Sequence, residues 1–295
     1  MSDKNQPVTK KKIRWLSLCL AAVIMLAALP LHPMPARGDT ATGNITVGVT
    51  PFAIAVNPVT NKIYVANSGS NTVTVIDGAD NSTATVAAGS YPYAVAINPA
   101  TNKIYIANCN SKTVTVIDGA NNSTTDVDVG TYPMAIAVNP VTNKIYVVNC
   151  NSKTVTVIDG ANNNTATVNV GDEPVAVAVN PVTNKIYVAN EGSDTVTVID
   201  GADNSTTTAA AGTKPVAVAI NPATNKIYVV NSVSNNVTVI DGADNTTTNV
   251  DVGAGPLAVA INPATNKIYV ANNVSNNVTV IDGADNSTAT VAAGS

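Results

Sequence analysis

The residues of this chain that could do chemistry are mostly carboxylates, and six aspartates recur at a spacing of 41 residues. A lysine in the motif Asn-Lys-Ile-Tyr precedes each of them by 15 residues. A hairpin turn over 68–71 would place Lys62 opposite Asp77, and such a pair contributes only about 0.2–1 kcal/mol. We therefore assign both residues to structure and not to metal or acid–base chemistry. The aspartates are Asp77, Asp118, Asp159, Asp200, Asp241 and Asp282.

A second set of residues differs from one 41-residue unit to the next and falls in two loops of each unit. Loops held by a rigid scaffold are where binding residues concentrate. The set divides into an aromatic sector and an acidic sector, flanked by Lys112, Lys153 and Lys214. The candidate partner-binding face consists of Phe52, Tyr91, Tyr93, Tyr132, Met134, Asp172, Glu173, Glu191 and Asp194.

This candidate face has two interpretations. In the first it binds a protein, a glycan or Ca²⁺, although calcium requires about six to eight oxygen ligands converging at one point. In the second, Phe52, Tyr93 and Met134 are the bulky first residues of an inner strand and pack between neighbouring units, while the acids are solvated loop residues.

The chain after residue 38 has no histidine, arginine or tryptophan. Loss of residues 1–38 would remove six of the 15 bases and one of the 19 acids, which leaves nine bases, 18 acids and a net charge of about −9. Such a charge opposes contact with nucleic-acid phosphates. A general base acting near neutral pH would have to be a carboxylate. We expect no catalytic residue, no nucleic-acid partner and no cofactor, with Ca²⁺ as the one ion to consider.

Cys109 and Cys150 occupy the same position in adjacent units. A pair of cysteines in an exported protein suggests a disulfide. Equivalent positions on neighbouring units should, however, lie farther apart than the ~7 Å between Cα atoms that a disulfide tolerates. We therefore expect two free or partly buried thiols.

Residues 1–38 have the pattern of a signal peptide. Lys10, Lys11, Lys12 and Arg14 precede an apolar run over 15–29, and small residues at positions 36 and 38 suit a cleavage site. We expect a secreted, periplasmic or cell-surface protein whose folded domain is 39–295. The alternative is an uncleaved anchor, because the run approaches the ~20 residues that cross a bilayer. Membrane contact is expected only in that case.

The remaining chain is six copies of the 41-residue unit, without insertions. A period near 40 with no helical pattern predicts four short strands per unit, which is the geometry of a β-propeller blade. In the first unit we predict strands over about 52–56, 62–67, 72–77 and 83–88, the polar fourth strand lying on the outer rim. The expected fold class is therefore an all-β propeller of four-stranded blades. The tyrosines that mark the units are Tyr64, Tyr105, Tyr146, Tyr187, Tyr228 and Tyr269.

Asn44–Gly48 matches the fourth strand of a unit whose first three strands are missing. A ring closes when such a strand pairs with the other three strands of the last blade. We predict that a seventh blade is completed beyond Ser295, that the sequence is truncated there, and that the complete propeller has seven blades. The alternative is a six-bladed ring with one redundant strand.

The segments Lys-Ile-Tyr-Val-Ala-Asn at 62–67 and Val-Thr-Val-Ile-Asp-Gly at 73–78 resemble the YVTN repeat family of surface-layer β-propellers. The resemblance recurs six times and covers about residues 44–295. It implies an extracytoplasmic seven-bladed propeller of a bacterial or archaeal envelope, and no settled activity. Related propellers resemble lactonases and quinoprotein dehydrogenase subunits, whose sites use histidine, arginine or acidic metal ligands.

The expected function is a binding or structural propeller of the cell envelope that presents its variable loops to a protein or glycan, in structure or adhesion. The alternative is a periplasmic hydrolase or redox partner with a site at the channel. The first hypothesis expects no bound cofactor and no turnover of lactones, and the second expects a retained metal or measurable turnover.

Overall fold

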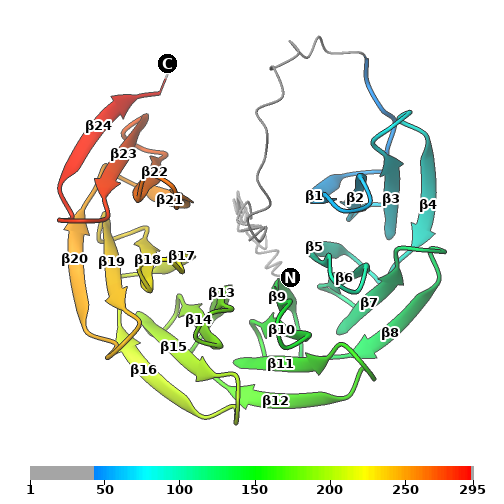
Figure 1. Cartoon of the computed structure of the whole chain (residues 1–295), viewed down its shortest axis with the longest axis horizontal. Coiled ribbons are helices and arrows are strands. Elements are labelled where there is room, and N and C mark those ends of the chain that lie inside the picture. Colours follow the sequence, from blue (N-terminus) through cyan, green and yellow to red (C-terminus); the bar gives the residue numbers. More distant parts are fainter. Residues whose placement is uncertain (1–42, 294–295) are drawn as a thin grey trace, which may run out of the picture.

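Each 41-residue unit forms one four-stranded antiparallel sheet, and six such sheets are arranged around a central axis (Figure 1). The structure is a computed structural model that describes residues 43–293, and the described part contains strands and turns but no helix. Within each sheet the strands follow sequence order, from an inner strand beside the axis to an outer strand at the rim. We number the sheets as blades 1 to 6, from β1–β4 to β21–β24.

The bounds of the strands repeat from blade to blade. The inner strands are β1 (Pro51–Asn57), β5 (Pro92–Asn98), β9 (Pro133–Asn139), β13 (Pro174–Asn180), β17 (Pro215–Asn221) and β21 (Pro256–Asn262). The second strands are β2 (Lys62–Asn67), β6 (Lys103–Asn108), β10 (Lys144–Asn149), β14 (Lys185–Asn190), β18 (Lys226–Asn231) and β22 (Lys267–Asn272). The third strands are β3 (Thr72–Asp77), β7 (Thr113–Asp118), β11 (Thr154–Asp159), β15 (Thr195–Asp200), β19 (Asn236–Asp241) and β23 (Asn277–Asp282). The outer strands are β4 (Thr83–Ala87), β8 (Thr124–Asp128), β12 (Thr165–Asn169), β16 (Thr206–Ala210), β20 (Thr247–Asp251) and β24 (Thr288–Ala292).

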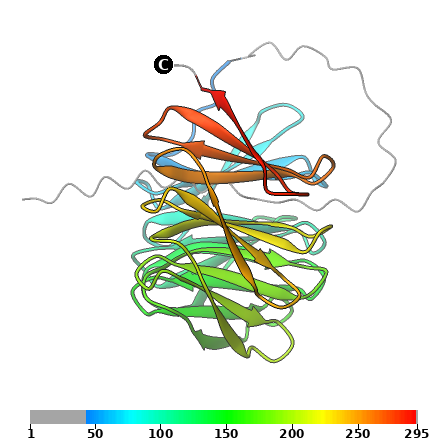
Figure 2. The ribbon, with the colours of Figure 1, turned by 90° about the vertical axis from the view of Figure 1, so that its left-hand side faces the viewer.

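The predicted fold class and strand positions are confirmed. The second and third strands match the prediction at both ends, the inner strand is one residue longer at each end, and the outer strand ends one residue earlier. The outer strand is also the most exposed, with only its fourth residue buried in blades 1 to 5. Figure 2 shows the ring from the side, with the connecting loops gathered on two opposite faces.

The turns of one face are shaped by asparagine. Asn61 and Asn81 both adopt a positive φ, of 53° and 63°, a conformation that asparagine tolerates better than most residues. Gly78 approaches the first of these turns so closely that a Cβ there would lie 2.5 Å from Asn61 Oδ1. A glycine is therefore required at this point of each blade.

The core lies between neighbouring blades. In the first interface Tyr64, Val73 and Val75 of blade 1 pack against Ile104 and Ile106 of blade 2. The equivalent tyrosine is fully buried in blades 1 to 5. Because burying one such side chain stabilises by about 1.5–3 kcal/mol, the stacking of blades is the main stabilising contact of the ring.

Polar contacts also link the blades. The amide of Asn57 donates from blade 1 to Oδ1 of Asn102 in blade 2 at 2.9 Å, and the same bond recurs at each later interface at 2.8 Å. Its acceptor is the asparagine held at positive φ in the next blade's first turn. The strained turn and the interface therefore support one another. The later donor and acceptor pairs are Asn98 and Asn143, Asn139 and Asn184, Asn180 and Asn225, and Asn221 and Asn266.

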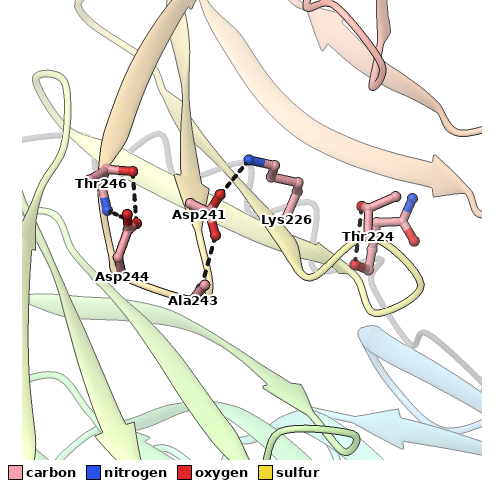
Figure 3. A network of polar contacts seen from close by, with 7 residues as sticks. Thr224, Lys226, Asp241, Ala243, Asp244 and Thr246 are labelled. Atoms are coloured by element: carbon pink, nitrogen blue, oxygen red, sulfur yellow. Dashed lines mark hydrogen bonds and ion pairs between the residues drawn. The ribbon is translucent and has the colours of Figure 1, made fainter.

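The recurrent lysine and aspartate are opposite one another, as Lys62 is to Asp77. They form a close ion pair in blades 5 and 6, with Lys226 Nζ 2.7 Å from Asp241 Oδ2 (Figure 3), and this hydrogen bond lowers the pKa of Asp241. In blade 2 the same pair is longer, at 4.0 Å, and in blades 1, 3 and 4 the lysine donates to a backbone oxygen of the next blade, as Lys62 does to Gly119. The expectation of a simple cross-strand pair is therefore only partly right, because the neighbouring blade offers a competing acceptor.

The aspartate also shapes its own turn. Asp241 Oδ1 accepts a bond from the backbone N–H of Ala243 at 2.9 Å, and Asp244 accepts one from Thr246 (Figure 3). The bond to the recurrent aspartate is present in all six blades. The recurrent aspartates therefore have a structural role, because each one stabilises the turn that follows its third strand.

The ring has an open sector between blade 6 and blade 1 (Figure 1). Asn44–Gly48, which matched an outer strand, forms no strand, because the described residues provide no third strand beside it. The predicted seventh blade stays a prediction. The predicted signal peptide over 1–38 lies outside the described residues, and none of the described residues forms a helix long and apolar enough to span a bilayer.

The buried tyrosines provide a test of the core. The Tyr187 hydroxyl is buried without a hydrogen-bond partner among the described residues, and burial raises its pKa to about 12. Tyr187→Phe should therefore raise the free energy of unfolding by up to about 1 kcal/mol, since a buried unsatisfied hydroxyl is costly. Urea unfolding followed by circular dichroism measures the change.

The matched control is Tyr269→Phe in blade 6, because Tyr269 is 40% exposed and no change is expected there. A loss of stability of 1 kcal/mol or more for Tyr187→Phe alone would contradict this account of the core, because it would show that the hydroxyl has a partner in solution.

Candidate binding face on the variable loops

Two loops of every blade meet on one face of the ring, which we call the variable face. One loop joins an outer strand to the next inner strand, and the other joins the second and third strands. A backbone N–H of the second loop donates to a backbone oxygen of the first in every blade, for example Cys109 to Tyr91 at 2.9 Å. The donor and acceptor residues of this bond, from blade 1 to blade 6, are Ser68 and Thr50, Cys109 and Tyr91, Cys150 and Tyr132, Glu191 and Glu173, Ser232 and Lys214, and Asn273 and Gly255.

The backbone of the first loop is strained at the position just before each inner strand. Tyr91 and Tyr132 adopt φ values of 59° and 61°, and Glu173 and Lys214 do the same at 48° and 57°. Blade 6 has Gly255 at this point, which shows that the turn itself needs no side chain. Non-glycine residues at positive φ cost of order 1 kcal/mol, so these side chains are present at a cost to stability.

The aromatic sector divides into buried and exposed parts. Phe52 stacks on Tyr93 with ring centroids 4.2 Å apart, and Met134 packs on the same cluster. These three residues lie between blades, as the packing interpretation expects. Tyr91 and Tyr132 are 37% and 38% exposed, so they are the aromatic groups that a partner can reach.

The acidic sector lines a shallow, open hollow of about 410 Å³ between the loops of blades 3 to 5. Lys153 Nζ lies 2.8 Å from Asp172 Oδ1, and both side chains are more than half exposed. Asp194 has a structural role, because its Oδ1 accepts a 2.8 Å bond from the backbone N–H of the strained Lys214. The four predicted acids Asp172, Glu173, Glu191 and Asp194 do line one hollow together.

Glu191 differs from the other three acids because it is only 5% exposed. Its Oε1 lies 3.3 Å from Nζ of Lys214, which comes from the following blade. The expectation that all four acids are solvated is wrong for this residue. The sequence did hold a signal, because the equivalent residues of the other units are small: Ser68, Cys109, Cys150, Ser232 and Asn273.

Among residues 43–293, no three histidine, cysteine, aspartate or glutamate side chains are placed to hold a metal ion. Cys109 and Cys150 are both free, as expected. Burial raises the pKa of each thiol to about 11. At Cys109 a hydrogen bond from Tyr132 acts in the opposite direction and lowers the pKa. At Cys150 the charges of Glu173 and Glu191 raise the pKa further. Both thiols are therefore protonated and weakly nucleophilic at neutral pH.

The six stacked blades define this chain as a β-propeller. No family model matches it, and no curated protein does. Among solved structures it is similar to the hydrazine synthase of Kuenenia stuttgartiensis, with a TM-score of 0.66 and 21% identity over 83% of this chain and 80% of that one. At this identity the likeness concerns the fold alone.

The two lysines of the hollow allow a test of the buried carboxylate. Lys214→Met should lower the free energy of unfolding by about 1–3 kcal/mol, because it leaves Glu191 buried without its cation. Lys153→Met is the matched control, and it should have little effect because its ion pair with Asp172 is exposed. Thermal and urea unfolding measure both.

Adding Glu191→Gln to Lys214→Met should recover at least half of the loss, since the amide carries no charge to desolvate. Equal losses of unfolding free energy in the two lysine variants, or no recovery of it in the double variant, would show that Lys214 does not stabilise the buried carboxylate of Glu191.

Proposed function

We propose that this chain is an extracytoplasmic binding propeller of the cell envelope that presents its variable face to a protein or glycan partner. The observation that carries the proposal is the contrast between the two faces. The opposite face repeats the same asparagine and aspartate contacts around the ring, whereas the strained position of the variable face carries five different residue types in six blades.

The strained positions support a binding role. Glycine would relieve the strain, as Gly255 does in blade 6, yet two blades carry tyrosine there. Exposed tyrosines are amphipathic contact residues, able to stack on a sugar ring and to donate a hydrogen bond. The hollow lined by Asp172 and Lys153 adds carboxylates and lysines of the same face that can bond to hydroxyl or amino groups.

The location in the envelope follows from the predicted leader and from the resemblance to YVTN-repeat surface-layer propellers. Under this proposal the ring is a rigid support and its loops determine the partner. The net charge of about −9 expected after removal of the leader fits a partner that is neutral or basic at the contact.

The proposal is tested with envelope fragments of the producing cells as the probe. The purified chain should bind them, and the double variant Tyr91→Ser with Tyr132→Ser should bind at least tenfold more weakly, since a tenfold change corresponds to about 1.4 kcal/mol. Pretreating the fragments with periodate or with protease decides between a glycan and a protein partner.

The matched control changes two exposed apolar residues of the opposite face, Val59→Ser with Val141→Ser. Those substitutions should leave binding unchanged. The proposal fails if they weaken binding as much as the tyrosine substitutions do, or if the parent chain does not bind.

A further inference from the structure

Cys109 and Cys150 are free thiols on adjacent blades, and the fold does not require either of them. Each begins the loop between a second and a third strand, and the bond that fixes this loop uses only its backbone N–H. Any side chain can therefore occupy the position. The other blades have Ser68, Glu191, Ser232 and Asn273 there, so cysteine occurs only in two blades that are neighbours.

One residue, Tyr132, connects the two cysteines. Its backbone oxygen accepts a 3.0 Å bond from the N–H of Cys150, and its hydroxyl is hydrogen-bonded to the thiol of Cys109. Burial raises the pKa of Cys109, against that hydrogen bond, and a charge on Cys150 raises the pKa further. The two thiols therefore interact across the interface between blades 2 and 3.

Met134 adds a third sulfur atom at this interface. It packs on the buried cluster that contains Cys109, which is only 2% exposed. Met134 also has the position in blade 3 that Tyr93 has in blade 2, and Tyr93 belongs to the same cluster as Cys109. By the repeat of the blades, Met134 lies beside Cys150 in the same way. The one methionine of residues 43–293 is thus located with their only two cysteines.

The ligand atoms of this sulfur cluster, formed by Cys109, Met134 and Cys150, determine which ion it suits. Thiolate and thioether are soft ligands, and Cu⁺ is a soft cation that is satisfied by about two or three of them. Structural zinc sites use about four cysteine, histidine or carboxylate ligands. Among residues 43–293 no three such side chains converge, so the sulfur cluster favours Cu⁺ over Zn²⁺.

Negative charge lies on the accessible side of the sulfur cluster. Cys150 is only partly buried, so an ion can reach it from the variable face. After burial, the charges of Glu173 and Glu191 are what raise the pKa of Cys150. Lys214 offsets the charge of Glu191 at 3.3 Å. The remaining negative charge of Glu173 favours a cation beside Cys150.

We propose that Cys109, Met134 and Cys150 form a binding site for Cu⁺ between blades 2 and 3. When the ion binds, both S–H protons are released to solvent and the two thiolates coordinate it together with the thioether, without a change in oxidation state. Tyr132 positions the two cysteines. This inference is independent of the partner proposed for the variable face.

The experiment uses the full chain, reduced and kept without oxygen. It is titrated with Cu⁺ held by a chromophoric chelator, and with Ag⁺ as a soft probe that stays in one oxidation state. Native mass spectrometry should show one ion per chain. Either ion should also raise Tm, because it binds the folded chain in preference to the unfolded one. Zn²⁺ at the same concentration should give neither result.

Three substitutions remove the sulfur ligands one at a time. Cys109→Ser and Cys150→Ser should each weaken Cu⁺ binding at least ~100-fold, because a hydroxyl is a poor ligand for a soft cation. Met134→Leu keeps the volume of the side chain and should weaken binding about tenfold. Cys19→Ser is the matched control, because this third cysteine belongs to the predicted leader, and it should leave binding unchanged. Circular dichroism checks that each variant folds, and Cys150→Ser at a partly buried position is the variant least able to disturb the core.

The proposal is overturned if the reduced chain retains neither Cu⁺ nor Ag⁺, if any of the three sulfur variants binds as tightly as the parent chain, or if Zn²⁺ competes equally. It is also overturned if non-reducing mass spectrometry finds a Cys109–Cys150 disulfide in protein isolated from the producing cells, because the two sulfur atoms would then be unavailable to an ion.

Discussion

The packing of one blade's tyrosine and valine face on the isoleucine and valine face of the next blade is the interaction on which this structure depends. A single four-stranded sheet has two apolar faces and cannot bury either alone. Stacking buries both, and it draws the asparagine turns together so that Asn57 bonds to Asn102 across the interface. Since the same contacts recur at five interfaces, the stability of the ring is shared by its units and not concentrated in one centre.

This arrangement separates stability from recognition. The turns that lock the blades together lie on one face, where asparagine, aspartate and lysine repeat with little change. On the other face, a backbone hydrogen bond such as Cys109 to Tyr91 fixes the loops without involving the side chains. Those side chains can therefore differ from blade to blade while the backbone stays the same, and this freedom is what a binding surface needs.

Most of the fold was predictable from the sequence, because a 41-residue period leaves little freedom in placing strands, and the second and third strands were predicted to the residue. The candidate site was predictable only as a set of positions. The burial of Glu191 and the hydrogen bond between Tyr132 and Cys109 depend on how adjacent blades approach one another. Whether Lys62 bonds within its own blade or to Gly119 depends on the same geometry, which spacing along one chain does not encode.

The central claim is that contacts between blades, and not contacts within a blade, hold this protein together. Native-state hydrogen exchange resolved by strand tests it most directly, since protection reports the stability of each region. The account predicts that amides of β10 and β14, in blades covered on both sides, exchange more slowly than those of β2 and β22 in the end blades. Equal protection of all six second strands would contradict it.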